Sequence, residues 1–162
     1  MNGRSQSGYQ KNKIWISQKS HYFEDASEFV TDNQSYDSRA VAFVDLWNRG
    51  VLDVIVANQN KKLLVYKNTV NDEHNWIAFL LEGTQTNKSA IGALVKVFWD
   101  GQVQTQIVTG GMGFSSQNQR RLQFGLGKAD RVDKVQIIWP GGSMQEIINP
   151  EIRKVHQLKE MK

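Results

Sequence analysis

The nine residues from Asp45 to Asp53, DLWNRGVLD, have the length of a calcium-binding loop. In the pattern D-x-D-x-D-G-x-x-D, carboxylates at the first, third, fifth and ninth positions surround the ion, because Ca²⁺ prefers a large set of oxygen ligands. Asp45 and Asp53 keep the two end positions, and Gly50 keeps the glycine. Trp47 and Arg49 stand at the third and fifth positions, so two anionic ligands are missing and one is replaced by a fixed positive charge.

Three interpretations of this loop follow from its charges. Coulomb repulsion between Arg49 and a divalent ion a few ångströms away argues against bound calcium. We expect the Arg49 guanidinium to replace the metal and to bridge Asp45 and Asp53, since its planar donors match carboxylate geometry. The alternatives are a degenerate calcium site held by Asp45 and Asp53, and an ordinary hairpin with exposed charges. No other cofactor is expected.

The loop GGMGFSSQNQRR, from Gly110 to Arg121, is the second candidate site. Glycines, an aromatic residue, amides and arginines together are typical of contact with a peptide or a carbohydrate. The expected ligand-binding residues are Phe114, Ser116, Gln117, Asn118, Arg120 and Arg121. In the alternative interpretation the loop is structural, with glycines supplying positive φ and Phe114 anchored in the core.

Patterns for catalysis or phosphate binding are weak. The segment from Gly83 to Gly92, GTQTNKSAIG, lacks the glycine and the spacing of a phosphate-binding loop. His21, His74 and His156 are far apart in the sequence, and no G-x-S-x-G nucleophile motif occurs. Whether the protein is an enzyme stays open, because distant residues can meet in a fold. A non-catalytic role is the favoured prediction.

Composition indicates a globular protein with a basic N-terminal arm. The chain has 162 residues, 40% of them hydrophobic, and a formal net charge of +4. The first twenty residues contain Arg4, Lys11, Lys13 and Lys19 and no acid, so we expect residues 1–11 to form a mobile basic arm. The rest is nearly neutral, which argues against nucleic-acid binding. The chain has no cysteine, no apolar stretch of signal-peptide length and no run long enough for a membrane span.

Short runs rich in Val, Ile, Phe and Trp, separated by polar turns, predict an all-β protein. Strands are expected within residues 13–17, 40–45, 52–58, 63–68, 76–83, 91–99, 102–110, 121–127, 132–139, 143–149 and 154–158. The polar run 68–75 is the best domain boundary. Asp100-Gly101 predicts a two-residue hairpin, because both central positions of a type I′ turn need positive φ. Gln102, Gln104 and Gln106 then share one face, which we expect to be solvated or to meet a partner.

The second half resembles the ASPIC/UnbV domain, on the segments NWIAFLLEGTQTNKSAIGALV, GGMGFSSQ, FGLG and VDKVQIIWPGG. The first half, on FEDAS and AVAFVDLWNRGVLDVIVANQN, resembles the last repeat of an FG-GAP or VCBS-type β-propeller. Both parts occur together in the cartilage acidic protein family. The resemblance implies one propeller-type β-blade over residues 12–70, followed by a compact β-sandwich or barrel over residues 74–160.

The resemblance also implies a function class. We expect a non-catalytic extracellular or periplasmic interaction or adhesion module that engages a protein or glycan surface and forms the C-terminal part of a longer propeller protein. A propeller closes with several blades, so we expect the lone blade to be covered by the second domain, by upstream blades or by a second copy of the chain. The alternative, an enzyme or accessory domain in enediyne-type natural-product biosynthesis, follows from other relatives of the domain.

Overall fold

The computed structural model describes residues 10–18, 22–30, 34–70 and 73–161. Strands make up 47% of the described residues, and α1 (Ser27–Val30) is a single helical turn, so the all-β prediction is confirmed. Most of the predicted basic arm, residues 1–9, lies outside the described residues, as does His21. The helices in the part of the chain that the structure describes include none that is long and apolar enough to cross a membrane.

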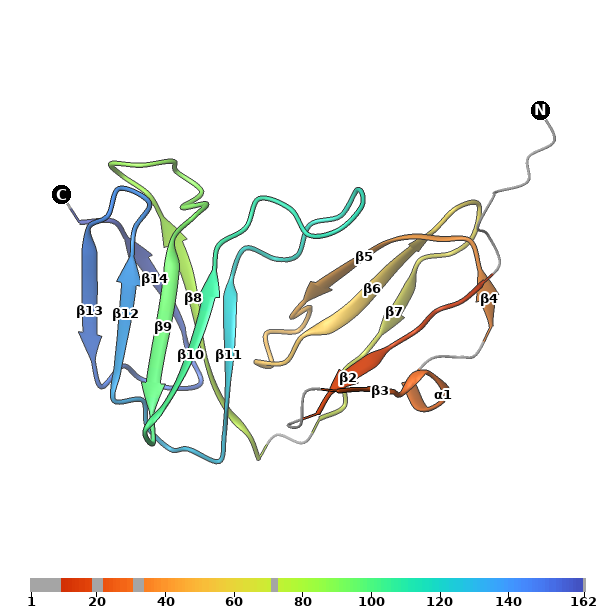
Figure 1. Ribbon diagram of the computed structural model, residues 1–162, viewed down its shortest axis with the longest axis horizontal. Coiled ribbons are helices and arrows are strands. Elements are labelled where there is room, and N and C mark those ends of the chain that lie inside the picture. The colour runs from red at the N-terminus through yellow and green to blue at the C-terminus, as the bar shows by residue number, and fades with distance from the viewer. Residues whose placement is uncertain (1–9, 19–21, 31–33, 71–72, 162) are drawn as a thin grey trace.

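The first half of the chain forms three small sheets (Figure 1). Its strands are β1 (Gln10–Lys11), β2 (Trp15–Ser17), β3 (Phe23–Asp25), β4 (Ser35–Tyr36), β5 (Ser38–Val44), β6 (Asp53–Asn58) and β7 (Leu64–Tyr66). The largest sheet is antiparallel, in the order β5–β6–β7, and its first turn contains the Asp45–Asp53 loop. Strand β1 pairs with β4, and β2 pairs with β3.

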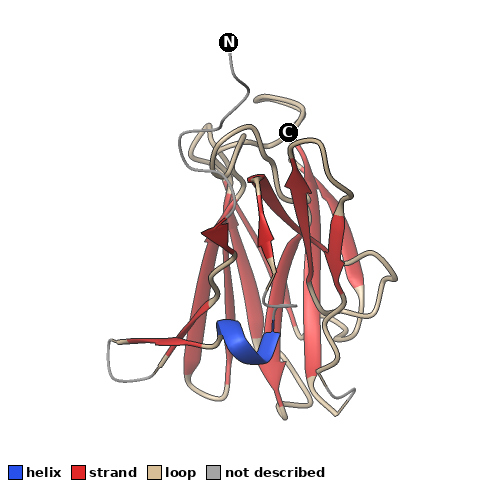
Figure 2. Cartoon of the chain, turned by 90° about the vertical axis from the view of Figure 1, so that its right-hand side faces the viewer, coloured by secondary structure: helices blue, strands red, loops and turns tan. Residues whose placement is uncertain are grey.

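The second half forms two sheets that lie face to face (Figures 1 and 2). Its strands are β8 (Asn75–Glu82), β9 (Leu94–Trp99), β10 (Gln102–Ile107), β11 (Leu122–Gly127), β12 (Lys134–Ile138), β13 (Met144–Ile148) and β14 (Val155–Lys159). One sheet has the order β10–β9–β12–β13 and is antiparallel throughout. The other has the order β11–β8–β14, with a parallel β8–β14 pair. Among the described residues neither sheet closes into a barrel.

The hydrophobic core lies between these two sheets. Alternation along the strands points Val95 and Val97 of β9 inward against Ile77 and Phe79 of β8, and all four are fully buried. Phe79 meets Phe124 of β11 edge to face, with ring centroids 5.9 Å apart. This core is a property of the second half, so the second half carries most of the packing that supports the fold.

The Asp100-Gly101 hairpin forms as predicted, with φ of 47° and 70° at the two turn residues. The pairing register places Gln102 opposite Trp99 and Gln104 opposite Val97. These glutamines therefore lie on the core side of the sheet, yet they stay exposed because β10 is an edge strand. The apolar residues of β10 point outward, and Val103 is 55% exposed.

Coverage of the β5–β6–β7 sheet is incomplete. Val41 and Phe43 of β5 share one face with Val54 and Val56 of β6, and this face is apolar. Val41 and Phe43 are 41% and 40% exposed, although Val56 is buried. The second half therefore does not cover this face in the way expected of the lone blade. Hydrogen bonds and an ion pair from the second half reach the edge of β5 and the Asp45–Asp53 loop instead.

Candidate functional site

The Asp45–Asp53 loop is closed by hydrogen bonds to its two carboxylates. Asp53 begins β6, and its side chain is fully buried. Its Oδ1 accepts hydrogen bonds of 2.8 Å from Arg49 Nη2 and from the Asn68 backbone, while its Oδ2 accepts one of 3.2 Å from the Leu46 backbone. Arg49 Nη1 also donates to the Asn68 carbonyl at 2.9 Å. The arginine thus fastens the loop to the segment that follows β7.

Asp45 is paired with an arginine from the other half of the chain. Its Oδ1 accepts the Arg49 backbone N–H at 2.8 Å, and its Oδ2 accepts the Gly50 N–H at 2.7 Å. Arg121 Nη2 lies 2.9 Å from Asp45 Oδ2 in an ion pair that is not aligned as a hydrogen bond. Arg121 Nη1 donates to Asn48 Oδ1 at 2.9 Å. The Asp45 side chain is fully buried and that of Arg121 is 13% exposed.

The two aspartates are paired with two arginines, whereas Arg49 alone was expected to pair with both. The Arg49 side chain contacts Asp53, and the cation beside Asp45 is Arg121, from 76 residues away. The expected bridge by Arg49 alone is not formed, because Arg49 contacts Asp45 through its backbone N–H while its guanidinium binds Asp53 and the Asn68 carbonyl. The oxygens of both aspartates already accept N–H donors, so this donor set does not fit a calcium ion. The described residues also contain no group of three or more His, Cys, Asp or Glu able to hold a metal.

Aromatic residues cover both sides of the loop. Trp47 stands at the third position of the D-x-D-x-D-G-x-x-D pattern, and its ring lies 5.3 Å from the Arg49 guanidinium carbon and 5.3 Å from Lys67 Nζ. Gly50 has a φ of 83°, and a Cβ there would fall 2.0 Å from Nε1 of Trp76, at the start of β8. Glycine is therefore required twice, for backbone conformation and for close approach of the second half.

The base of the Gly110–Arg121 loop is attached to the edge of β5. The Asn118 side chain accepts a 2.9 Å hydrogen bond from the Phe43 backbone, and the Gln119 backbone donates to the Phe43 carbonyl at 3.1 Å. Gln119 Oε1 accepts the Asp45 N–H at 3.0 Å. The loop covers this end of an edge strand, as loops often do in β-proteins. In Figure 1 it extends from β10 and β11 toward β5.

The structure divides the six predicted ligand-binding residues into two groups. Ser116 bonds the Met112 carbonyl, Asn118 bonds Phe43, Arg120 donates to Ser89 Oγ at 2.7 Å, and Arg121 pairs with Asp45. Phe114 is 79% exposed and therefore does not anchor the loop in the core; Gln117 is also exposed. Contact with a ligand would therefore involve the loop tip, since the loop base holds the two halves together.

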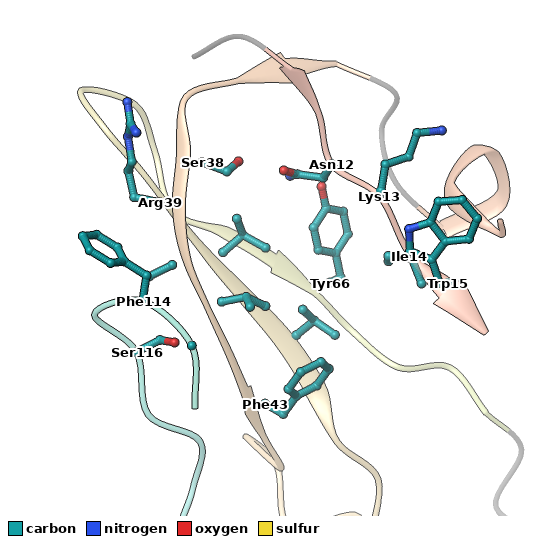
Figure 3. Close-up of a pocket in the computed structure, with 15 residues that line it drawn as sticks. Asn12, Lys13, Ile14, Trp15, Ser38, Arg39, Phe43, Tyr66, Phe114 and Ser116 are labelled. Atoms are coloured by element: carbon teal, nitrogen blue, oxygen red, sulfur yellow. The ribbon is translucent and has the colours of Figure 1, made fainter. Parts of the chain in front are cut away.

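Phe114 stands at one wall of an apolar groove of about 450 Å³ (Figure 3). The floor is the exposed face of the β5–β6–β7 sheet, with Val41, Phe43 and Val54 among its residues. The opposite wall is the segment that contains Trp15, which is 57% exposed. Sequence reasoning missed this groove, because its walls come from segments about a hundred residues apart in the chain.

The Gly83–Gly92 segment also has a role that the sequence did not reveal. The backbone N–H groups of Thr84, Gln85 and Thr86 all donate to Oε2 of Glu160, at 2.9–3.1 Å. Burial raises the pKa of this carboxyl, but the hydrogen bonds outweigh burial and leave the pKa below its ordinary value of 4.5. Three N–H groups converging on one anion form a nest. In this protein the nest is occupied by the carboxylate of the chain's own Glu160.

The described histidines have no arrangement suited to catalysis. His156 stacks on the Phe79 ring at 5.5 Å, and its Nε2 lies 2.8 Å from the Glu151 carbonyl. His74 is exposed at the start of the second half. His156 therefore has a packing role.

Residues 83–162 match the family model described as ASPIC and UnbV. The match leaves out β8, which was expected within the domain and lies at the centre of the β11–β8–β14 sheet. It does not extend over residues 1–82, so the FG-GAP or VCBS resemblance of the first half stays a prediction. No curated protein matches the chain. The comparison therefore supports an ASPIC/UnbV domain over residues 83–162 of the chain.

Proposed function

We propose that the chain is a non-catalytic protein-interaction module, in which residues 12–70 are a propeller-type blade joined to the ASPIC/UnbV domain. The observation that carries this proposal is the apolar groove between Trp15 and Phe114, because both aromatic side chains are more than half exposed at its walls. Exposed aromatic residues beside an apolar floor are typical of surfaces that bind protein segments. By resemblance, we place the module outside the cytoplasm, in an extracellular or periplasmic setting.

Charge favours an uncharged apolar protein segment as the occupant. Lys13 and Arg39 are the charged residues that the structure places along the groove, and each is already paired, with Asp25 at 2.7 Å and with Asp37 at 2.5 Å. A charged ligand would find no unpaired counter-charge in the described lining. A glycan would need many directed polar partners, whereas most side chains of the floor are aliphatic or aromatic.

Lys13 and Tyr66 are the only described lining residues of the groove that belong to the types used in general acid–base catalysis, and Lys13 is paired with Asp25. The described lining contains no histidine, aspartate or glutamate. General acid–base catalysis uses such residues within hydrogen-bond reach of the reacting atoms. Binding without chemistry is therefore the role that this surface supports best, in preference to an enzyme of natural-product biosynthesis.

Selection from a displayed library of short peptides tests the proposal on the full chain. We expect enrichment of apolar peptides whose affinity falls at least about tenfold in Phe114→Ser and in Trp15→Ser, a loss equivalent to about 1.4 kcal/mol. Phe29→Ser is the matched control, because Phe29 is 90% exposed and does not line the groove. Failure to enrich any peptide, equal binding by Phe114→Ser, or binding confined to an oligosaccharide array would overturn the proposal.

A further inference from the structure

The outer face of the β10–β9–β12–β13 sheet has a regular pattern of apolar and polar rows. The strand registers place four outward side chains side by side in each row, one from each strand. The first row is Val103, Phe98, Lys134 and Ile148; the middle row is Thr105, Lys96, Gln136 and Glu146; the third row is Ile107, Leu94, Ile138 and Met144. The third row is wholly apolar, and the first is apolar except for Lys134.

This face is open at its edges. The outermost residues of the apolar rows, Val103, Ile107, Met144 and Ile148, are between 50% and 64% exposed. Rows on one sheet face repeat every second residue, about 7 Å apart along the strands. Two apolar rows with a polar row between them present a flat surface that a matching sheet can cover.

The charges of the middle row are incompletely paired. Glu146 accepts from Gln136 Nε2 at 2.8 Å and lies 3.3 Å from Lys134 Nζ, while the Lys134 ammonium lies 5.2 Å from the centre of the Phe98 ring. Lys96 has no hydrogen bond or ion pair with any described residue. The row therefore ends in a carboxylate on β13 and contains an unpaired ammonium on β9.

We propose that this face binds the same face of a second copy of the chain, with the two-fold axis running along the strands between β9 and β12. Rotation about this axis places each row of one copy opposite the same row of the other copy, with the order of the strands reversed. Leu94 then faces Ile138 of the other copy, Ile107 faces Met144, and Lys96 faces Gln136. The strand that carries Lys96 is also offset sideways by only one strand spacing, roughly 4.8 Å, from the other copy's strand that carries Glu146, and the two long side chains together can span the sheet separation of about 10 Å.

Charge selects this axis over the other in-plane two-fold axis. An axis across the strands would place Lys96 against Lys96 and Glu146 against Glu146, and like charges that oppose each other are unfavourable. With the axis along the strands, the unpaired Lys96 of each copy gains an acidic neighbour. The twist of each sheet turns two packed sheets by about 30°, so the contacts nearest the axis, Leu94 with Ile138, match best.

The size of the face sets the strength of association. Four strands and five residues cover roughly 19 Å by 17 Å, about 320 Å² in projection, whereas a standard stable interface buries about 800 Å² per partner. The dimer is therefore weak and reversible. The residues of this face are not among those that line the groove at Phe114, whose floor is the β5–β6–β7 sheet of the first half.

Sedimentation velocity over a hundredfold range of concentration tests this dimer on the full chain. We expect wild type to show a reversible rise in mass with concentration. Lys96→Glu should weaken self-association at least about tenfold, or about 1.4 kcal/mol, since both symmetry-related contacts change sign. The charge-swapped Lys96→Glu, Glu146→Lys variant should recover most of this loss.

Phe114→Ser is the control for association through the groove and should leave the dimer unchanged. A chain that stays monomeric at every concentration would overturn the inference. So would loss of the dimer in Phe114→Ser together with full retention in Lys96→Glu. Circular dichroism spectra matching wild type establish that the variants are folded, so that a change in mass reports the interface.

Discussion

Replacing Arg121 by glutamine tests whether the Asp45–Arg121 ion pair joins the two halves. The variant leaves the Asp45 carboxylate fully buried, with two backbone N–H donors but without its cation 2.9 Å away. Removing one partner of a buried pair costs about 3–5 kcal/mol. We expect the lower value, about 3 kcal/mol, because the backbone donors remain and Arg121 itself is partly exposed. For a protein of this size, that loss lowers Tm by roughly 6–12 °C.

The assay is thermal and urea denaturation followed by circular dichroism, with two further variants. Arg120→Gln is the matched control, because Arg120 lies in the same loop and is exposed, and its side chain donates among the described residues only to Ser89; its cost should stay within about 0.5 kcal/mol. Adding Asp45→Asn to Arg121→Gln removes the stranded charge and should recover part of the loss. The reasoning is refuted if Arg121→Gln costs no more than Arg120→Gln, or if the double variant is less stable than Arg121→Gln alone.

Three further predictions concern other polar groups. Millimolar calcium should leave the wild-type Tm equal to that in EDTA, whereas Arg49→Asp should gain stability from calcium; stabilisation of wild type would contradict the assignment of arginine in place of metal. Glu160→Gln should destabilise the fold most above pH 4.5, since the folded pKa of Glu160 is lowered and its contribution is lost as pH falls through that folded value; equal destabilisation across an acid titration would contradict this. Tyr66→Phe should leave stability unchanged or raise it by up to about 1 kcal/mol in urea denaturation, because the buried Tyr66 hydroxyl has no hydrogen-bond partner among the described residues; a clear loss would show that the hydroxyl is satisfied.

Local patterns in the sequence predicted local structure well. The Asp100-Gly101 turn depends on the backbone preferences of two residues, so the sequence contains the information that it needs. The same holds for the alternation of Val95 and Val97, which are both fully buried. The environment of Gln102 could not be predicted in the same way, because strand alternation defines two faces of a sheet without indicating which face meets the core. Its exposure depends on β10 being an edge strand, which is a property of the whole sheet.

Contacts between the halves could not be derived in this way. Asp45 and Arg121 are each recognisable as charged residues in candidate loops, but no spacing relates them, since they are 76 residues apart. From the sequence alone, the Asp45–Asp53 and Gly110–Arg121 loops are predicted to be separate sites, the first for a metal or a metal-replacing arginine and the second for a ligand. The structure brings their bases together, so the same side chains that suggested binding are used for internal attachment.

The carboxylates at the two ends of the Asp45–Asp53 loop are paired with two different arginines. A calcium ion satisfies carboxylates that are already close in sequence, and it leaves when its concentration falls. Arg49 neutralises Asp53 from within the loop, whereas Arg121 reaches Asp45 from the ASPIC/UnbV domain on a long side chain. Arg121 therefore makes closure of the loop depend on its contact with the second half of the chain. Trp76, which packs against Gly50, has the same effect. Because neither arginine can dissociate from the chain, we expect the junction to be independent of calcium, and separating the halves would expose a buried carboxylate that had lost its cation.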